Sequence, residues 1–148
     1  MTDPAQAAAS PIPVTLGGKQ YQLSPWRDRD AGEWLRYVQD RVLDLADRSC
    51  KRLSPGAADL VMGHAMRIAS RLTALSPEAA AAAATPEGFA MVTWLRLRPN
   101  HKDLSVEQVQ ELLREAGAVE RVMEKINALN ELEQGAVDPK SRAGEPTP

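Results

Sequence analysis

The hydrophobic period of this chain changes once, between residues 23 and 29, and that change restricts the fold more than any other feature. Residues 12–23, IPVTLGGKQYQL, alternate apolar and polar side chains on both sides of Gly17-Gly18. Period two is typical of a β-strand, and a glycine pair supplies the positive φ angles of a two-residue type I′ turn. The segment therefore predicts a two-stranded β-hairpin over residues 12–24.

The predicted hairpin has one apolar face. Pairing across the two glycines places Val14 opposite Tyr21 and Ile12 opposite Leu23. Two strands alone are marginally stable in water, so this face must dock on something. The sequence leaves two alternatives open, the chain's own helices or a partner chain. If the second holds, the partner-binding side chains on the hairpin are Val14, Leu16, Tyr21 and Leu23.

After the hairpin, apolar residues recur at steps of three and four, which is the period of an amphipathic helix. The first such run covers about residues 29–48, with Trp34 beside a stripe made of Leu35, Val38, Val42 and Leu45. Three Ser/Thr-Pro pairs then mark helix starts, because the hydroxyl residue suits the N-cap and proline suits the first helical position. These pairs are Ser54-Pro55, Ser76-Pro77 and Thr85-Pro86.

The later helices are expected from the same kind of pattern. The helix that starts at Pro55 is predicted to reach about Ser76. The run from Phe89 to Leu97 is the most apolar part of the chain and is expected to lie centrally, anchored by Trp94. Further along, Ser105 and Gln108 predict a capping box, and a last amphipathic run covers residues 118–133.

The expected fold class is therefore mainly α, with an N-terminal two-stranded β-hairpin followed by a compact bundle of about five helices. Residues 12–133 are expected to form a single domain, with the hairpin at 12–24 and the helical part at 29–133. Residues 1–11 and 134–148 carry few apolar side chains, and we expect both ends to be flexible.

Composition excludes several kinds of protein. The formal net charge is -2, from 18 basic and 20 acidic residues, which argues against strong nonspecific binding to nucleic acid. The sequence contains no run of 18 apolar residues, so it predicts no membrane span, and its N-terminus lacks the pattern of a secretory signal. We therefore expect a soluble protein that is not exported, with neither nucleic acid nor a membrane among its partners.

No motif indicates catalysis. A phosphate-binding loop would need a helix after Gly17-Gly18-Lys19, but the pattern predicts a second strand there. His64 has no Asp, Glu, Cys or second His three or four residues away, and Cys50 is the only cysteine. We expect neither an enzyme, nor a metal site, nor a cofactor.

Two stretches of the sequence resemble the tail assembly chaperones of long-tailed bacteriophages and phage-like gene-transfer particles. The first is VTLGGKQYQLSPW, residues 14–26, which matches the family pattern T-L-G-G-K-x-Y-x-L-x-P. The second is FAMVTWLRLRPNHKDLSVEQVQELL, residues 89–113, which matches an apolar helix, a turn with histidine and a capped helix. The resemblance covers roughly residues 14–116, although the alanine-rich segment 50–84 does not align with the family pattern.

The resemblance implies a non-catalytic, virus-encoded chaperone. Such a protein keeps the tape-measure protein soluble and helps to recruit tail-tube subunits as they polymerise around it. Its implied location is the host cytoplasm during infection, and it is expected to be absent from the mature virion. We hypothesise that apolar grooves flanking Trp34 and Trp94 shield the long helices of the tape-measure protein, and a homo-oligomer is a further possibility.

Two other classes stay open at this point. One is a structural virion component, such as a head-to-tail connector or a tail completion protein, in which the same elements pack permanently against neighbouring copies. The other is a small helical DNA-binding regulator, which the mixed charge of every predicted helix disfavours because such a protein needs a basic recognition helix.

Overall fold

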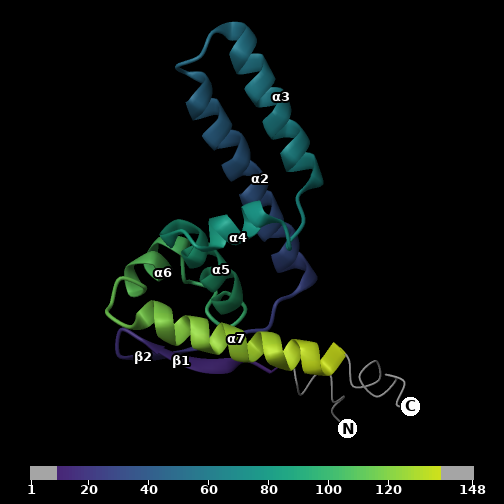
Figure 1. Ribbon diagram of the computed structural model, residues 1–148. Helices are drawn as coiled ribbons and strands as arrows, with labels where there is room; N and C mark the ends of the chain where they lie inside the picture. Colours follow the sequence, from purple (N-terminus) through teal and green to yellow (C-terminus); the bar gives the residue numbers. More distant parts are fainter. Residues whose placement is uncertain (1–9, 138–148) are drawn as a thin grey trace, which may run out of the picture. The chain divides into compact units, whose positions relative to one another are not determined.

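A computed structural model describes residues 10–137 of the chain, and the side chains among them as far as Leu132. It contains two strands and six helices within that range, in agreement with the predicted mainly α class (Figure 1). Backbone proximity divides the chain into two compact units, which we describe separately. Unit 1 holds the residues up to Trp26 and those from Thr93 onward, and unit 2 holds Arg27–Val92. The expected single domain over residues 12–133 stays a prediction.

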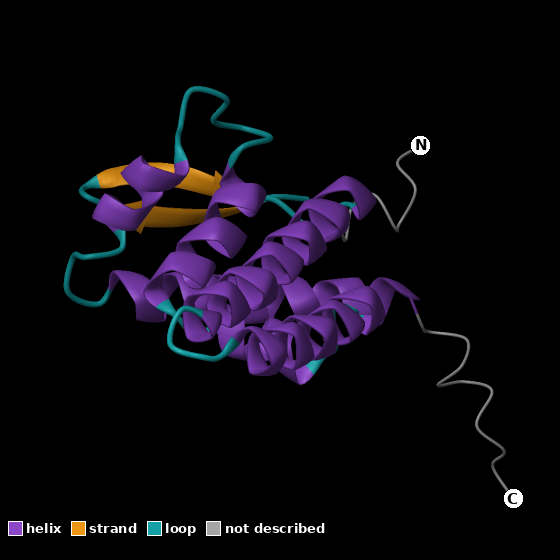
Figure 2. Cartoon of the chain, turned by 90° about the horizontal axis from the view of Figure 1, so that it is seen from above, coloured by secondary structure: helices purple, strands orange, loops and turns teal. Residues whose placement is uncertain are grey.

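The predicted hairpin is present in unit 1. Strands β1 (Ile12–Leu16) and β2 (Lys19–Leu23) pair antiparallel, and Figure 2 shows them side by side. Val14 is opposite Tyr21, and Ile12 is opposite Leu23, as the alternation predicts. The φ angles of the two turn glycines are 58° and 75°, so both carry the positive φ that a two-residue type I′ turn requires.

Unit 1 covers the apolar face of the hairpin with its own helices. These are the end of α5 (Pro86–Leu97), then α6 (Val106–Leu112) and α7 (Ala118–Val137), of which α7 packs on β1. Helix α7 buries one stripe at helical spacing, and α5 contributes leucines from its last turn. The largest fully buried apolar side chains of unit 1 are Leu16, Leu23, Leu95, Leu97, Leu129, Val109 and Val122.

The capping box predicted for α6 is confirmed. The backbone N–H of Gln108 donates to the Ser105 hydroxyl at 3.2 Å, and the Ser105 backbone N–H donates to the Gln108 side-chain oxygen at 2.8 Å. These two bonds satisfy donors that a helix N-terminus otherwise leaves unpaired. The break before α7 falls at Gly117, whose φ of 79° favours glycine.

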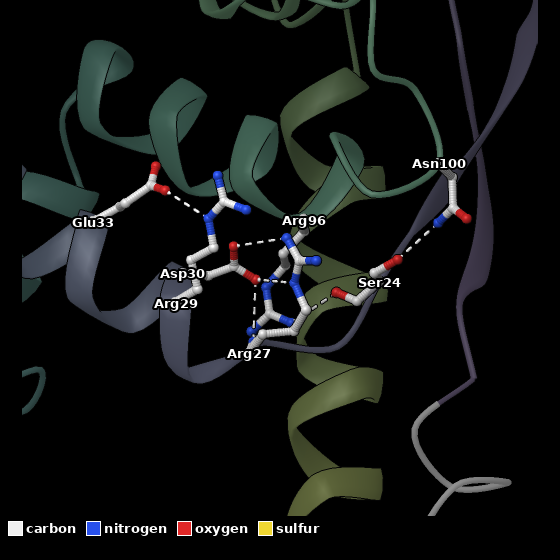
Figure 3. Close-up of polar contacts among 7 residues, drawn as sticks. All are labelled: Ser24, Arg27, Arg29, Asp30, Glu33, Arg96 and Asn100. Carbon is white, nitrogen blue, oxygen red and sulfur yellow. Dashed lines mark hydrogen bonds and ion pairs between the residues drawn. The ribbon is translucent and has the colours of Figure 1, made fainter.

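Unit 2 begins with α2 (Asp28–Cys50), which corresponds to the helix expected over about residues 29–48. Its first turn is held by the buried carboxylate of Asp30. That carboxylate accepts from the backbone N–H of Arg27 at 3.1 Å and from the Arg27 guanidinium at 3.1 and 3.2 Å (Figure 3). Arg29 pairs with Glu33 on the exposed side of the same turn.

Helix α3 (Pro55–Arg71) starts at the predicted Ser-Pro pair but ends earlier than expected. The predicted end at about Ser76 is wrong, because Leu72 is already extended and the Ser76 hydroxyl accepts from the Thr73 backbone N–H at 2.8 Å. This local side-chain bond offers the backbone an alternative to another helical turn. As a result Leu75 lies beyond the end of α3 and is 95% exposed.

The corner between α4 (Pro77–Ala83) and α5 depends on a glycine. A Cβ placed on Gly88 would lie 1.8 Å from the Ala82 carbonyl oxygen, so only glycine fits there without a backbone shift. Thr85 completes the corner, because its hydroxyl donates to the Ala82 carbonyl at 2.7 Å and accepts from the Gly88 N–H at 3.1 Å. Both predicted Pro starts, at Pro77 and Pro86, are confirmed.

Candidate functional site

A groove in unit 1 lies between β2 and α6. It is a hollow of about 490 Å³, within the range of sites that bind small ligands or anchoring side chains. Its apolar residues are Tyr21, Leu104 and Leu112. We call this hollow the β2–α6 groove, and its full lining is Gly17, Tyr21, Leu104, Gln108, Glu111, Leu112 and Glu115.

The hairpin turn forms one end of the β2–α6 groove and is held by charged side chains. The Glu115 carboxylate accepts from the Gly17 backbone N–H at 3.0 Å and from the Arg121 guanidinium at 3.0 Å. Arg121 also donates to the Thr15 carbonyl of β1 at 3.1 Å. A Cβ on Gly17 would lie 3.1 Å from the Leu112 side chain, so the turn approaches α6 closely.

A second hollow of about 420 Å³ adjoins the first and shares Tyr21, Leu104 and Gln108 with it. Its other lining residues are Lys19, Asn100, His101, Lys102 and Asp103. This second hollow therefore carries two lysines and one aspartate, whereas the β2–α6 groove carries Glu111 and Glu115. The floor that the two hollows share includes the apolar residues Tyr21 and Leu104.

His101 closes part of the outer edge of β2. Its Nε2 accepts a hydrogen bond from the Gln22 backbone N–H at 3.0 Å, and its ring meets the Tyr21 ring edge-on at 5.0 Å between centroids. Burial, and secondarily the charge of Lys19, lowers the pKa of the His101 imidazole. Both causes favour the neutral ring, which is the form that can accept this bond.

The loop that carries His101 and Leu104 is fixed by two contacts from α5. The Trp94 indole Nε1 donates to the Leu104 carbonyl at 2.7 Å, and the Arg98 guanidinium lies 5.0 Å from the centre of the Trp94 ring. Trp94 is therefore a part-buried support for the groove wall. It anchors this loop, in addition to belonging to the apolar run expected to be central.

The far end of β2 is tied to α5 by polar contacts at Ser24. Its backbone N–H donates to the Arg96 carbonyl at 2.8 Å, and its hydroxyl accepts from the Asn100 side chain at 2.7 Å. The Arg96 guanidinium donates to the Ser24 carbonyl at 3.3 Å and to the Asn130 side chain of α7 at 3.1 Å. Figure 3 shows Ser24 and Asn100 joined in this way. These bonds fix where β2 lies beside the loop.

The residues predicted from sequence as partner-binding are mostly interior. Val14, Leu16, Leu23 and Trp34 are between 0% and 5% exposed, and Tyr21 is 8% exposed. Of the two alternatives for the hairpin's apolar face, the structure has the chain's own helices cover it. Partner contact at these side chains stays a prediction that would require the chain to open. Tyr21 lines the groove, Trp94 supports its wall, and Trp34 stacks on Tyr37 at 5.3 Å in unit 2.

Some residues of the groove were not identified as site residues from sequence. Leu104 and Leu112 belong to the second stretch that carries the family resemblance, which was the available signal. Glu115 carries no such signal, because its role depends on the hairpin turn 98 residues away. Apolar spacing alone assigns leucines to a core and does not separate those that line a groove.

The β2–α6 groove is lined by apolar side chains, one glutamine and two glutamates. Within residues 10–137 no group of three or more His, Cys, Asp or Glu side chains is arranged so that it could hold a metal ion. No helix in the same range is long and apolar enough to span a membrane. In comparisons with known proteins, no family model, no curated protein and no solved structure matched the chain significantly.

Proposed function

We propose that this chain is a tail assembly chaperone of a long-tailed phage or a phage-like particle. In this proposal it has no catalytic activity and binds apolar segments of the tape-measure protein in the host cytoplasm. It releases them as tail-tube subunits assemble, and it is absent from the mature virion.

One observation carries the proposal. The two stretches that resemble the chaperone family, residues 14–26 and 89–113, meet at the β2–α6 groove. The first contributes Gly17 and Tyr21, and the second contributes Leu104 and Leu112. Residues that a family pattern retains far apart in sequence, and that the fold brings to one surface hollow, support a shared binding role for that hollow.

The shape and charge of the groove suit a helix with large apolar side chains. An apolar side chain of the client would lie over Tyr21 and Leu112, where it removes apolar surface from water. Glu111 in the groove and Lys102 in the adjoining hollow would orient the client by charge. Helix-in-groove binding of this kind is a common mode of segment recognition.

The test is the solubility of a tape-measure fragment that is co-expressed with the chain. Leu112→Glu places a charge in the groove. Gln108→Trp fills the groove from its exposed rim, and it also removes the capping-box bond from the Ser105 backbone N–H. We expect the wild type to keep the fragment soluble and each variant to lower the soluble yield at least tenfold. Met123→Glu is the matched control, because Met123 is 48% exposed on α7 and lies outside the groove lining.

Two results would contradict the proposal. One is a fragment that aggregates equally with and without the wild-type chain. The other is a Gln108→Trp variant, folded by circular dichroism, that protects the fragment as well as Met123→Glu does. Stoichiometric recovery of the chain from purified particles would instead indicate a structural component such as a head-to-tail connector.

A further inference from the structure

Helix α2 has a side that faces α3, and two contacts define it. The Gln39 side chain donates to the Ala69 carbonyl at 3.1 Å, and the Cys50 thiol donates to the Ala58 carbonyl at 3.4 Å. Residues 39 and 50 are three helical turns apart, so both point the same way from α2. Because these contacts pair an early residue of α2 with a late residue of α3, and the reverse, the two helices run antiparallel (Figure 1).

A second apolar line on α2 lies about a quarter to a third of a turn round the helix from the side that faces α3. It consists of Val38, Val42 and Leu45, at steps of four and three. Val38 is 0% exposed, in the part of α2 that also packs against α4, Val42 is half-buried, and Leu45 is 48% exposed. Unit 2 therefore covers the beginning of this line and leaves its continuation open.

Helix α3 extends the same apolar surface. Measured from its α2-facing residues Ala58 and Ala69, Val61 and Ile68 lie a quarter-turn round, on the same side of the helix pair as Leu45. Both are half-buried. We call this surface the α2–α3 apolar face, and it consists of Val42, Leu45, Val61 and Ile68.

The charges beside this apolar surface differ from those on the opposite face of the helix pair. Beyond the α2–α3 apolar face, the next positions round each helix carry three arginines and a histidine: Arg41 and Arg48 on α2, and His64 and Arg71 on α3. The opposite face of the pair carries Asp40, Asp44, Asp47 and Asp59, and also Arg36. Arg48 pairs with Asp44 at 3.1 Å, but the two side chains are 70% and 57% exposed, so this pair holds Arg48 only weakly.

We propose that the α2–α3 apolar face binds an amphipathic helix of another protein, and that Asp and Glu residues flank the apolar stripe of this helix. The apolar side chains of that helix would cover Leu45 and Val61, and its carboxylates would meet the basic positions on both rims. A second copy of this chain fits less well, because apposing two such faces would bring basic rims together. The proposal does not depend on the chaperone function.

The test uses two synthetic helical peptides labelled with fluorescein and measured by anisotropy against the full chain. Both carry leucines at steps of three and four, one with glutamates and the other with lysines flanking the stripe. We expect the glutamate peptide to bind at least tenfold more tightly, with an affinity that weakens as salt rises. Leu45→Glu is expected to weaken its binding at least tenfold.

Met66→Glu is the matched control, since Met66 is 59% exposed and lies toward the acidic face of the same helix pair. Arg41→Glu with Arg71→Glu tests the rims without changing the apolar line, and we expect it to reverse the preference between the two peptides. The proposal is overturned if the peptides bind equally or not at all, or if Leu45→Glu and Met66→Glu have equal effects. A wild-type dimer that Leu45→Glu dissociates in sedimentation experiments would also overturn it, in favour of a second copy.

Discussion

The two units of this chain bury different kinds of side chain. Unit 1 fills its interior with large residues such as Leu16, Leu95 and Leu97, each 0% exposed. In unit 2 most of the buried apolar residues are alanines, and several of its large apolar residues are exposed. Its buried alanines are Ala65, Ala69, Ala79, Ala82 and Ala90, and its exposed large residues are Leu45, Leu53, Leu60, Met66 and Leu75.

This difference affects how much each unit contributes to the folding free energy and how much apolar surface it exposes. The free energy gained by burial rises with apolar area, about 25 cal/mol per Å², and an alanine side chain supplies little of it. Alanine does allow helices to approach closely, which explains how α2 and α3 pack with few large buried residues. Unit 1 is therefore expected to hold more of the folding free energy, whereas unit 2 presents apolar side chains that a partner could cover.

The comparison is tested most strongly by truncating one leucine in each unit. Leu16→Ala should lower the free energy of unfolding by about 3–4 kcal/mol, because it leaves a cavity in a closed core. Leu45→Ala should change it by less than about 0.5 kcal/mol, as expected for a surface position. Urea denaturation followed by circular dichroism measures both, and similar losses for the two variants would contradict the comparison.

The sequence predicted this contrast only in part. The alternation around Gly17-Gly18 was sufficient for the hairpin and its register, because side-chain period and turn chemistry are local properties. The spacing also predicted the apolar stripe through Leu45, of which Val38 is 0% exposed and Leu45 is 48% exposed. Spacing shows which side of a helix is apolar, but it does not show how far along the helix another element covers that side.

Unit 2 also has a close backbone contact, at Gly88. Gly88→Ala would place a Cβ 1.8 Å from the Ala82 carbonyl oxygen, so the α4–α5 corner would have to open. We expect a loss of about 3 kcal/mol, at the upper end of the cost of overpacking. Thermal unfolding would measure it, with Gly63→Ala as control because nothing lies within 4 Å of that Cβ. Equal melting temperatures would show that the corner yields easily.

In unit 1 the two turn glycines separate backbone strain from contact with α6. Both have positive φ, so alanine at either position should cost about 1 kcal/mol or more. Gly17→Ala should cost about 1 kcal/mol more than Gly18→Ala, because only its Cβ meets the Leu112 side chain, at 3.1 Å. Chemical denaturation of the two variants gives the difference directly. A smaller loss for Gly17→Ala would mean that the turn does not press on α6.

The smallest expected effect is a pH dependence from His101. Its folded pKa is lowered, so the folded state binds fewer protons than the unfolded state, and stability rises with pH. The contribution is present above the unfolded value of 6.5 and is lost as the pH falls from there through the folded pKa. We expect a small loss, because its causes are burial of the imidazole and, secondarily, the charge of Lys19.

His101→Gln tests the origin of this pH dependence. The glutamine side-chain oxygen can accept the same N–H but does not titrate, so the part of the pH dependence that belongs to His101 should disappear. Unfolding free energies of the wild type and the variant at several pH values provide the comparison. An unchanged pH profile in the variant would assign the effect to other groups.

The candidate site was less predictable from sequence than the fold. Motif resemblance pointed to the stretches that supply Tyr21, Leu104 and Leu112, but it did not place them on one groove. The bond from the Gly17 N–H to Glu115 joins residues 98 positions apart, and no local pattern encodes such a contact. The hairpin side chains expected to bind a partner are buried within unit 1, and their contact with a partner stays a prediction.

Hydrogen exchange of the full chain, with and without a tape-measure fragment, tests whether the β2–α6 groove binds this client. We expect slower exchange on binding at residues 19–23 of β2 and residues 104–113 around α6, which form the walls of the groove. If a complex forms and exchange slows in neither segment, the groove is not the binding site.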